Sequence, residues 1–199
     1  MCSWCWGYRP VWTALKQHLP AQVRVVNILG GLAADSDEAM SQETQQAIQG
    51  YWHKIHNLLG TEFNFDFWHN NKPRRSTYKA CRAVIAATNQ GQEEAMIKAI
   101  QQGYYLRAMN PSETDVLIQL AKEIGLNATK FEIDLESRET HKKLSEQIQF
   151  TRQSPISGFP SLALSVSACG SELRSVKKDY HDYRVTLDHI LELLKQSQN

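Results

Sequence analysis

The chain opens with Met1-Cys2-Ser3-Trp4-Cys5-Trp6-Gly7-Tyr8-Arg9-Pro10, in which two cysteines stand three positions apart. The apolar spacing from Trp6 to Leu19 predicts a helix that follows this pair directly, with Pro10 as a kink or an early turn. A sulfur at a helix start lies beside unpaired backbone N–H groups and the positive end of the helix dipole, which lower the pKa of a thiol. The second sulfur, one turn on, can reach back to form a disulfide. The motif therefore predicts a redox dithiol, half of a zinc site, or two inert thiols.

The zinc interpretation needs two more ligands. His53 and His56 form the one close histidine pair of the sequence, and their spacing places them roughly on one side of a helix. However, Trp52 and Ile55 turn that helix toward a core, and no second Cys-x-x-Cys exists. We therefore favour redox chemistry at Cys2 and Cys5 and expect no metal, with a zinc site as the alternative.

A second feature is the segment Ser157-Gly158-Phe159-Pro160-Ser161, which directly precedes an apolar run. A proline that opens a strand is tolerated for steric reasons alone. The functional interpretation is a cis peptide bond between Phe159 and Pro160. Such a bond leaves the backbone of the preceding residue available to an extended substrate chain, in the manner of strand addition.

The periodicity along the chain predicts an α/β architecture. The β-branched run 23–29 indicates a buried strand, and the alternation after Pro160 indicates a hairpin that turns at Cys169-Gly170. Between them lies a helical block of about residues 37–152. Within it, Phe63, Phe65 and Phe67 alternate with polar residues as in a short extended piece, and Ser112-Glu113-Thr114-Asp115 reads as a capping box. An apolar stripe then indicates a C-terminal helix, formed by Leu187, Ile190, Leu191 and Leu194.

This order of elements resembles the thioredoxin fold, and the long helical block resembles its DsbA-like branch, in which a helical domain is inserted. Within that branch the chain is similar to bacterial predicted protein-disulfide isomerases of the FrnE-like kind. Three stretches carry this likeness: 1–10, the motif Pro73-Arg74-Arg75-Ser76 with 80–83, and 158–162. The resemblance implies a thioredoxin-like domain of residues 1–36 and 153–199 and an inserted helical domain of residues 37–152.

The resemblance also implies roles for individual residues. Cys2 matches the attacking thiol, Cys5 the resolving thiol and Pro160 the cis-proline. Trp4, Gly158, Phe159 and Pro160 are the candidates for substrate binding, because they flank the dithiol or the proline. In the thioredoxin fold a central strand leads into the Cys-x-x-Cys, and only Met1 precedes it here. We therefore expect the first sheet strand to be missing from this chain and native residues to lie upstream of Met1.

Composition excludes several classes of protein and of binding partner. The 199 residues carry 22 Lys and Arg against 21 Asp and Glu, so charge gives no reason to expect nucleic acid or an acidic membrane surface as partner. No apolar run approaches ~18 residues. Four cysteines are too few for a disulfide framework. We expect Cys81 to be buried and inert, Cys169 to lie in a turn, and the basic cluster to form a solvated face or a glutathione or phosphate site; its members are Lys72, Arg74, Arg75 and Arg82.

The sequence thus predicts a cytoplasmic thiol–disulfide oxidoreductase or isomerase that acts on protein, peptide or small-molecule disulfides through a dithiol/disulfide cycle. It needs no bound cofactor, although glutathione could serve as reductant or co-substrate. The alternatives are a glutathione-linked transferase or isomerase of DsbA-like fold, which normally needs one nucleophile, and a non-catalytic zinc- or peptide-binding module.

Overall fold

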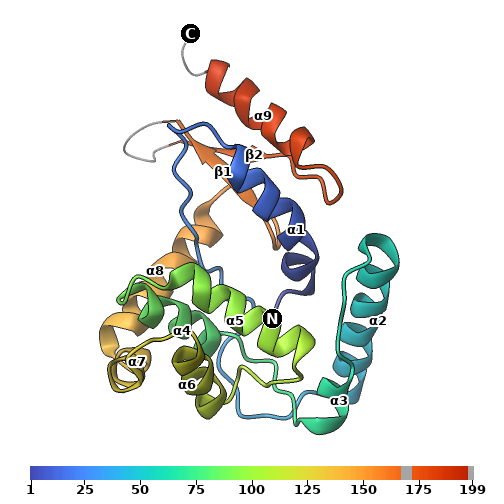
Figure 1. Cartoon of the computed structure of the whole chain (residues 1–199), viewed down its shortest axis with the longest axis vertical. Helices are drawn as coiled ribbons and strands as arrows, with labels where there is room; N and C mark the ends of the chain where they lie inside the picture. Colours follow the sequence, from blue (N-terminus) through green and yellow to red (C-terminus); the bar gives the residue numbers. More distant parts are fainter. Residues whose placement is uncertain (167–171, 197–199) are drawn as a thin grey trace. The chain divides into compact units, whose positions relative to one another are not determined.

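The computed structural model describes residues 1–166 and 172–196, and the chain divides into two compact units (Figure 1). We call residues 2–28 and 150–199 the sheet unit, and residues 29–149 with Met1 the helical unit. Residues 29–36, predicted from the sequence to belong to the thioredoxin-like domain, belong to the helical unit.

The sheet unit contains helix α1 (Ser3–His18), strands β1 (Leu162–Ser165) and β2 (Leu173–Val176), and helix α9 (Tyr183–Gln196). The two strands pair antiparallel, with Leu162 opposite Val176 and Ser165 opposite Leu173. This pairing confirms the predicted hairpin. Its predicted turn at Cys169-Gly170 lies outside the described residues.

One small core holds the two helices on the hairpin. Leu15 of α1 is completely buried, and it packs in one cluster with Val176 of β2 and with Ile190 and Leu193 of α9. Burial of such a leucine side chain stabilises the folded state by roughly 2 kcal/mol. The cluster therefore fixes α1, and with it the cysteine pair at its start.

Helix α1 begins earlier than the sequence pattern predicts and continues through Pro10. Proline lacks the N–H that would bond to the carbonyl four residues back, so the helix loses one backbone bond there. Apolar contacts on both sides of Pro10 outweigh that loss, since Tyr8 and Leu15 are both buried. The prediction of an early turn at Pro10 was wrong.

The predicted buried strand at residues 23–29 is also wrong. The structure assigns no strand there, and Val25, Val26 and Ile28 are exposed. Branched side chains favour extended backbone, but a strand forms only where a neighbouring chain completes its hydrogen-bond ladder. In residues 1–166 and 172–196, β1 and β2 pair with each other and no third strand is present, and none precedes α1.

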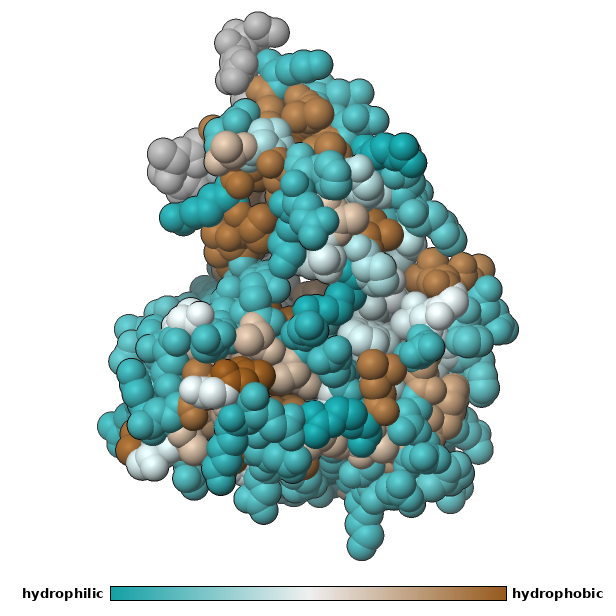
Figure 2. Space-filling model, in the orientation of Figure 1, coloured by the Kyte–Doolittle hydropathy of each residue, from teal (hydrophilic) through white to brown (hydrophobic). Residues whose placement is uncertain are grey.

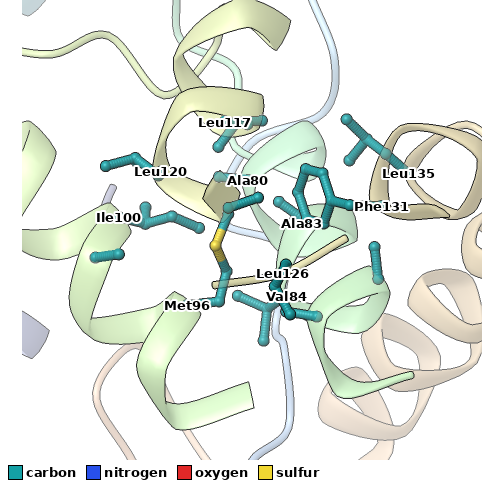
Figure 3. Close-up of a cluster of buried hydrophobic side chains, with 14 residues drawn as sticks. Ala80, Ala83, Val84, Met96, Ile100, Leu117, Leu120, Leu126, Phe131 and Leu135 are labelled. Carbon is teal, nitrogen blue, oxygen red and sulfur yellow. The ribbon is translucent and has the colours of Figure 1, made fainter. Parts of the chain in front are cut away.

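The helical unit is built from short helices around an apolar centre. Figure 3 shows Met96 reaching into this centre among side chains such as Ile100, Leu120 and Phe131. The helices are α2 (Gln42–Leu59), α3 (Asp66–Asn70), α4 (Tyr78–Thr88), α5 (Glu93–Leu106), α6 (Thr114–Glu123), α7 (Ala128–Leu135) and α8 (Arg138–Gln153), the last of which crosses into the sheet unit.

Two local predictions fail in this unit. Phe67 lies in α3 and packs on Trp52 in an aromatic cluster, so the three alternating phenylalanines do not form one extended piece. The expected capping box does not form either, because the Ser112 hydroxyl donates to Asn110 Oδ1 at 2.7 Å instead. In both cases a tertiary or loop contact replaces the local pattern.

Hydrophilic residues cover most of the face in Figure 2, with separate patches of hydrophobic residues between them. Among the described residues, no helix combines the length and the apolar character that crossing a bilayer requires.

Candidate active site

The cysteine pair lies at the start of α1 in the geometry of a helix cap. Cys2 is the N-cap residue, with extended backbone, and its Sγ accepts a hydrogen bond from the Cys5 backbone N–H at 3.2 Å. The first turn of α1 contains no acidic residue. The Cys2 sulfur therefore faces the positive end of the helix with no neighbouring carboxylate in that turn to oppose a thiolate.

The two sulfurs differ in acidity. A hydrogen bond from the Cys5 side chain, with further bonds from backbone N–H groups, lowers the pKa of Cys2, although burial acts against it. The same bond requires the proton of Cys5, so it and burial raise the pKa of Cys5 well above 9.0. Cys2 thus ionises first, which is the order that an attacking Cys2 and a resolving Cys5 require.

The Gly158-Phe159-Pro160 segment lies beside the Cys2 sulfur, although it is 157 positions away in the sequence at Phe159. The Phe159–Pro160 peptide bond is cis, and the Cys2 thiol donates to the Phe159 carbonyl oxygen at 3.4 Å. Gly158 adopts a φ of 72°, a conformation that glycine takes without strain. The Ser161 hydroxyl donates to the Gly158 carbonyl at 2.9 Å and closes the turn.

Sequence reasoning missed a third segment beside the dithiol, the connection between β2 and α9. Tyr180 packs edge-on against Trp4 and Tyr8, with ring centroids 5.4 Å and 5.2 Å away. Burial, with the charges of the two cysteines, raises the pKa of Tyr180 to about 12. The positive charge of Lys178 acts on Cys5 and favours its thiolate, against the larger effects of hydrogen bonding and burial. No spacing links this loop to residues 2–5, so the sequence offers no signal for it.

The histidine pair lies on α2, in the helical unit. The His53 ring stacks on Phe65 with centroids 4.5 Å apart, and His56 Nδ1 bonds the Thr61 carbonyl at 3.0 Å. Both histidines line a cavity of about 680 Å³ with Glu62 and other residues. Within the described ranges, no three His, Cys, Asp or Glu side chains gather closely enough to hold a metal ion.

The other candidates have structural partners. Arg74 pairs with Asp37 and Glu113, and the buried Arg82 pairs with Asp35 at 2.6 Å. Half of the basic cluster is therefore neutralised by carboxylates. Burial raises the pKa of Cys81 to about 11, which fits an inert thiol. Cys169 lies outside the described residues.

Known proteins share this fold. A family model described as thioredoxin matches residues 1–187. A solved structure from Nitrosomonas europaea, assigned as a protein disulfide isomerase, is 25% identical with a TM-score of 0.83, and the match covers 98% of this chain and 94% of that one. The cytosolic disulfide reductase DsbM from Pseudomonas aeruginosa, solved with GSH, is 21% identical with a TM-score of 0.74, covering 100% and 96%. The fold is thus thioredoxin-like, of the DsbA-like kind.

Curated relatives carry a different name. The ClpXP adapter protein SpxH from Bacillus subtilis is 25% identical over 166 residues, which are 81% of this chain and 54% of the relative. SpxH from Halalkalibacterium halodurans is 23% identical over 167 residues, with the same coverage. The chain spans about half the length of these curated relatives.

Proposed function

The chain belongs to the thioredoxin family, and we propose that it is a thiol–disulfide oxidoreductase or isomerase in which Cys2 attacks and Cys5 resolves. The observation that carries the proposal is the Cys2 sulfur itself, which accepts the Cys5 N–H and lies at the open end of α1. A thiolate stabilised in this way is the reactive form of cysteine in disulfide exchange.

The proposed cycle begins with a disulfide of the substrate. The Cys2 thiolate attacks one substrate sulfur, the substrate S–S bond breaks, and the leaving sulfur takes up a proton as a thiol. Cys5 then loses its proton and attacks Cys2 Sγ, which releases the second substrate thiol and leaves a Cys2–Cys5 disulfide. The substrate has gained two electrons and two protons, and two molecules of a thiol such as glutathione return the dithiol to its reduced form.

Substrate recognition is assigned to the residues around the sulfur. We propose that Trp4 flanks the bound chain and that the backbone of Gly158, Phe159 and Pro160 pairs with it. Support comes from the position of the Phe159 carbonyl, 3.4 Å from Cys2 Sγ. An extended peptide that pairs with this backbone would bring its own cysteine to Cys2.

The proposed substrates are proteins or peptides that carry disulfides or thiols, and the proposed compartment is the bacterial cytoplasm. DsbM, whose fold this chain shares, is described as cytosolic and was solved with GSH. Thioredoxin and glutathione keep cytosolic thiols reduced, so the role there is reductive. Glutathione is accordingly the proposed reductant, with no resident cofactor.

Two other functions compete with this one. A glutathione-linked transferase would need Cys2 alone. Here the Cys5 thiol donates a hydrogen bond to Cys2, and its raised pKa suits a resolving thiol. A non-catalytic binding module is favoured by the SpxH relatives, which are named as adapters. An adapter needs a docking surface but no turnover.

Insulin reduction with glutathione as the reductant separates these functions. We expect turnover by the native protein and complete loss in Cys2→Ser. Cys5→Ser should also stop turnover, but it should accumulate a mixed disulfide between Cys2 and the substrate, visible by non-reducing electrophoresis. Cys81→Ser is the matched control and should retain activity. Undiminished turnover in Cys2→Ser would refute the proposal, and stoichiometric zinc in the purified protein would favour the binding module.

A further inference from the structure

The loop that carries Tyr180 is held firmly between β2 and α9. Asp179 Oδ1 accepts the backbone N–H groups of His181 and Asp182, each at 2.8 Å. The Asp179 N–H donates to the hydroxyl of Thr186, a completely buried residue of α9, at 3.2 Å. These bonds fix the backbone on both sides of Tyr180, so the position of its ring is determined by the fold.

That ring contacts one face of α1 at its very start. Trp4 and Tyr8 are four residues apart, so they lie one above the other on the helix, and Tyr180 meets both edge-on at 75° and 67°. Each such edge-on aromatic pair stabilises the packing beyond the effect of the surface that it buries. Trp4 stands between the two cysteines, in the turn that delivers the Cys5 N–H to the Cys2 sulfur.

A helix start without a partner frays, because its first four N–H groups have no acceptor within the helix. In α1 the first turn has a sulfur as its cap, a weaker acceptor than the oxygen of Ser or Asp. The turn therefore needs support from outside the helix, and Tyr180 is placed to give it.

We propose that Tyr180 is a positioning residue of the dithiol, whose ring clamps Trp4 and Tyr8 and so keeps the first turn of α1 formed around the Cys2 sulfur. The inference rests on the proposed function of that sulfur. The aromatic ring of Tyr180, and not its hydroxyl, makes these contacts. The hydroxyl stays protonated near neutral pH, because burial and the cysteine charges hold the pKa of Tyr180 at about 12.

The charged and titratable groups around Cys2 are few and can be named. The amino group of Met1 lowers the pKa of Cys2, and Cys5 acts on it from α1. Lys178 of the loop acts on Cys5, Asp179 of the loop acts on Tyr8, and Tyr8 packs on Tyr180. Replacing the Tyr180 ring changes none of these charges. Loss of burial alone would lower the pKa of Cys2, whereas loss of the hydrogen bonds in the first turn would raise it, so an upward shift reports the geometry of the turn.

The test is iodoacetamide alkylation of the reduced protein across pH, with peptide mapping of Cys2. Tyr180→Phe should match the native protein. Tyr180→Ala and Tyr180→Leu should shift the Cys2 midpoint upward, toward 9.0, and slow alkylation at pH 6–7 by roughly three- to tenfold, since one pKa unit is a tenfold change in thiolate. Insulin reduction should slow in parallel at neutral pH and recover above the new midpoint.

Tyr183→Ala is the matched control. Tyr183 also joins the C-terminal segment to α1, but it stacks on His18 at the other end of that helix, with centroids 4.5 Å apart. It should leave the Cys2 midpoint unchanged. If Tyr183→Ala shifts the midpoint as much as Tyr180→Ala, the effect is general loosening and the inference fails.

The inference also fails if both Tyr180→Ala and Tyr180→Leu titrate like the native protein, or if Tyr180→Phe behaves like Tyr180→Ala. Alkylation needs no disulfide substrate, so the result is separable from the proposed function. A protein that reduces no insulin but shows the shift would refute the function and support the clamp, and the converse result would refute the clamp alone.

Discussion

The sulfur of Cys2 accepts a hydrogen bond from the backbone N–H of Cys5, 3.2 Å away. Cys5, the proposed resolving residue, therefore also stabilises the thiolate of Cys2, once through its backbone N–H and once through its own thiol. This double contact makes the two cysteines unequal before any substrate binds.

The first prediction concerns the order of reactivity. In the reduced protein Cys2 should react with iodoacetamide first, with a midpoint below 9.0, because hydrogen bonds lower its pKa while they raise that of Cys5. Cys5 and Cys81 should both react later, because burial raises the pKa of each thiol. Peptide mapping after alkylation from pH 5 to 10 gives the order, and faster labelling of Cys5 would reverse the assignment.

The second prediction uses Cys81 as a probe of stability at high pH. Its pKa is 9.0 in an unfolded chain and about 11 when folded, because burial disfavours the thiolate. A raised folded pKa stabilises fully below pH 9 and loses its effect as pH rises toward 11. The difference between these two pKa values corresponds to about 3 kcal/mol. Urea unfolding of native protein and Cys81→Ala should show a constant difference below pH 8 and a diverging one above pH 9. Parallel curves throughout would contradict the raised pKa of Cys81.

The third prediction concerns the core that holds α1. Leu15 is completely buried against Val176, Ile190 and Leu193, so Leu15→Ala should destabilise the sheet unit by about 2–5 kcal/mol. Leu58→Ala makes the same chemical change at a side chain that is 53% exposed, and it should cost under about 0.5 kcal/mol. Equal shifts in the unfolding midpoint of the two variants would show that Leu15 is not a core residue.

The fourth prediction compares two glycines of positive φ in the helical unit. Gly60, at 67°, has open space where a Cβ would lie, so Gly60→Ala should cost only the backbone strain, about 1 kcal/mol. Gly31, at 58°, would place a Cβ 2.5 Å from Ile148 and 2.7 Å from Tyr78. Gly31→Ala should therefore cost a further 1–3 kcal/mol or so from overpacking. Thermal unfolding of the pair decides, and equal losses would rule out close packing at Gly31.

Periodicity predicted elements whose apolar pattern matches the face that they bury. The hairpin follows from alternation in two adjacent strands, and the helix of residues 183–196 follows from an apolar stripe, which packs on Leu15 of α1. The failures are elements whose pattern finds no matching partner or a different one. Residues 23–29 have a strand's composition, but the described sheet provides no edge that pairs with them, and Phe67 joins a helix because Trp52 packs against it.

The parts of the site that form sequence motifs were predictable, whereas the part that folding alone brings to the cysteines was not. Cys2, Cys5 and the Gly158–Pro160 segment stand out by their residue types and by a known family pattern. Tyr180 has no such signal, because nothing in the stretch 177–182 resembles a site, and only the folded chain brings it to Trp4. Long-range proximity of this kind is set by packing, which periodicity does not encode.

The bond between the Cys2 thiol and the Phe159 carbonyl oxygen has one more consequence for the proposed cycle. The proton shared in that bond is the same proton that Cys2 gives up to become a nucleophile. While it is present, the sulfur is a poor nucleophile, and the proton uses one of the two lone pairs of the carbonyl oxygen that would accept a substrate N–H. Ionisation of the Cys2 thiol therefore makes the sulfur reactive and frees the Phe159 carbonyl oxygen in the same step. Substrate affinity and turnover should consequently rise with pH along one common curve.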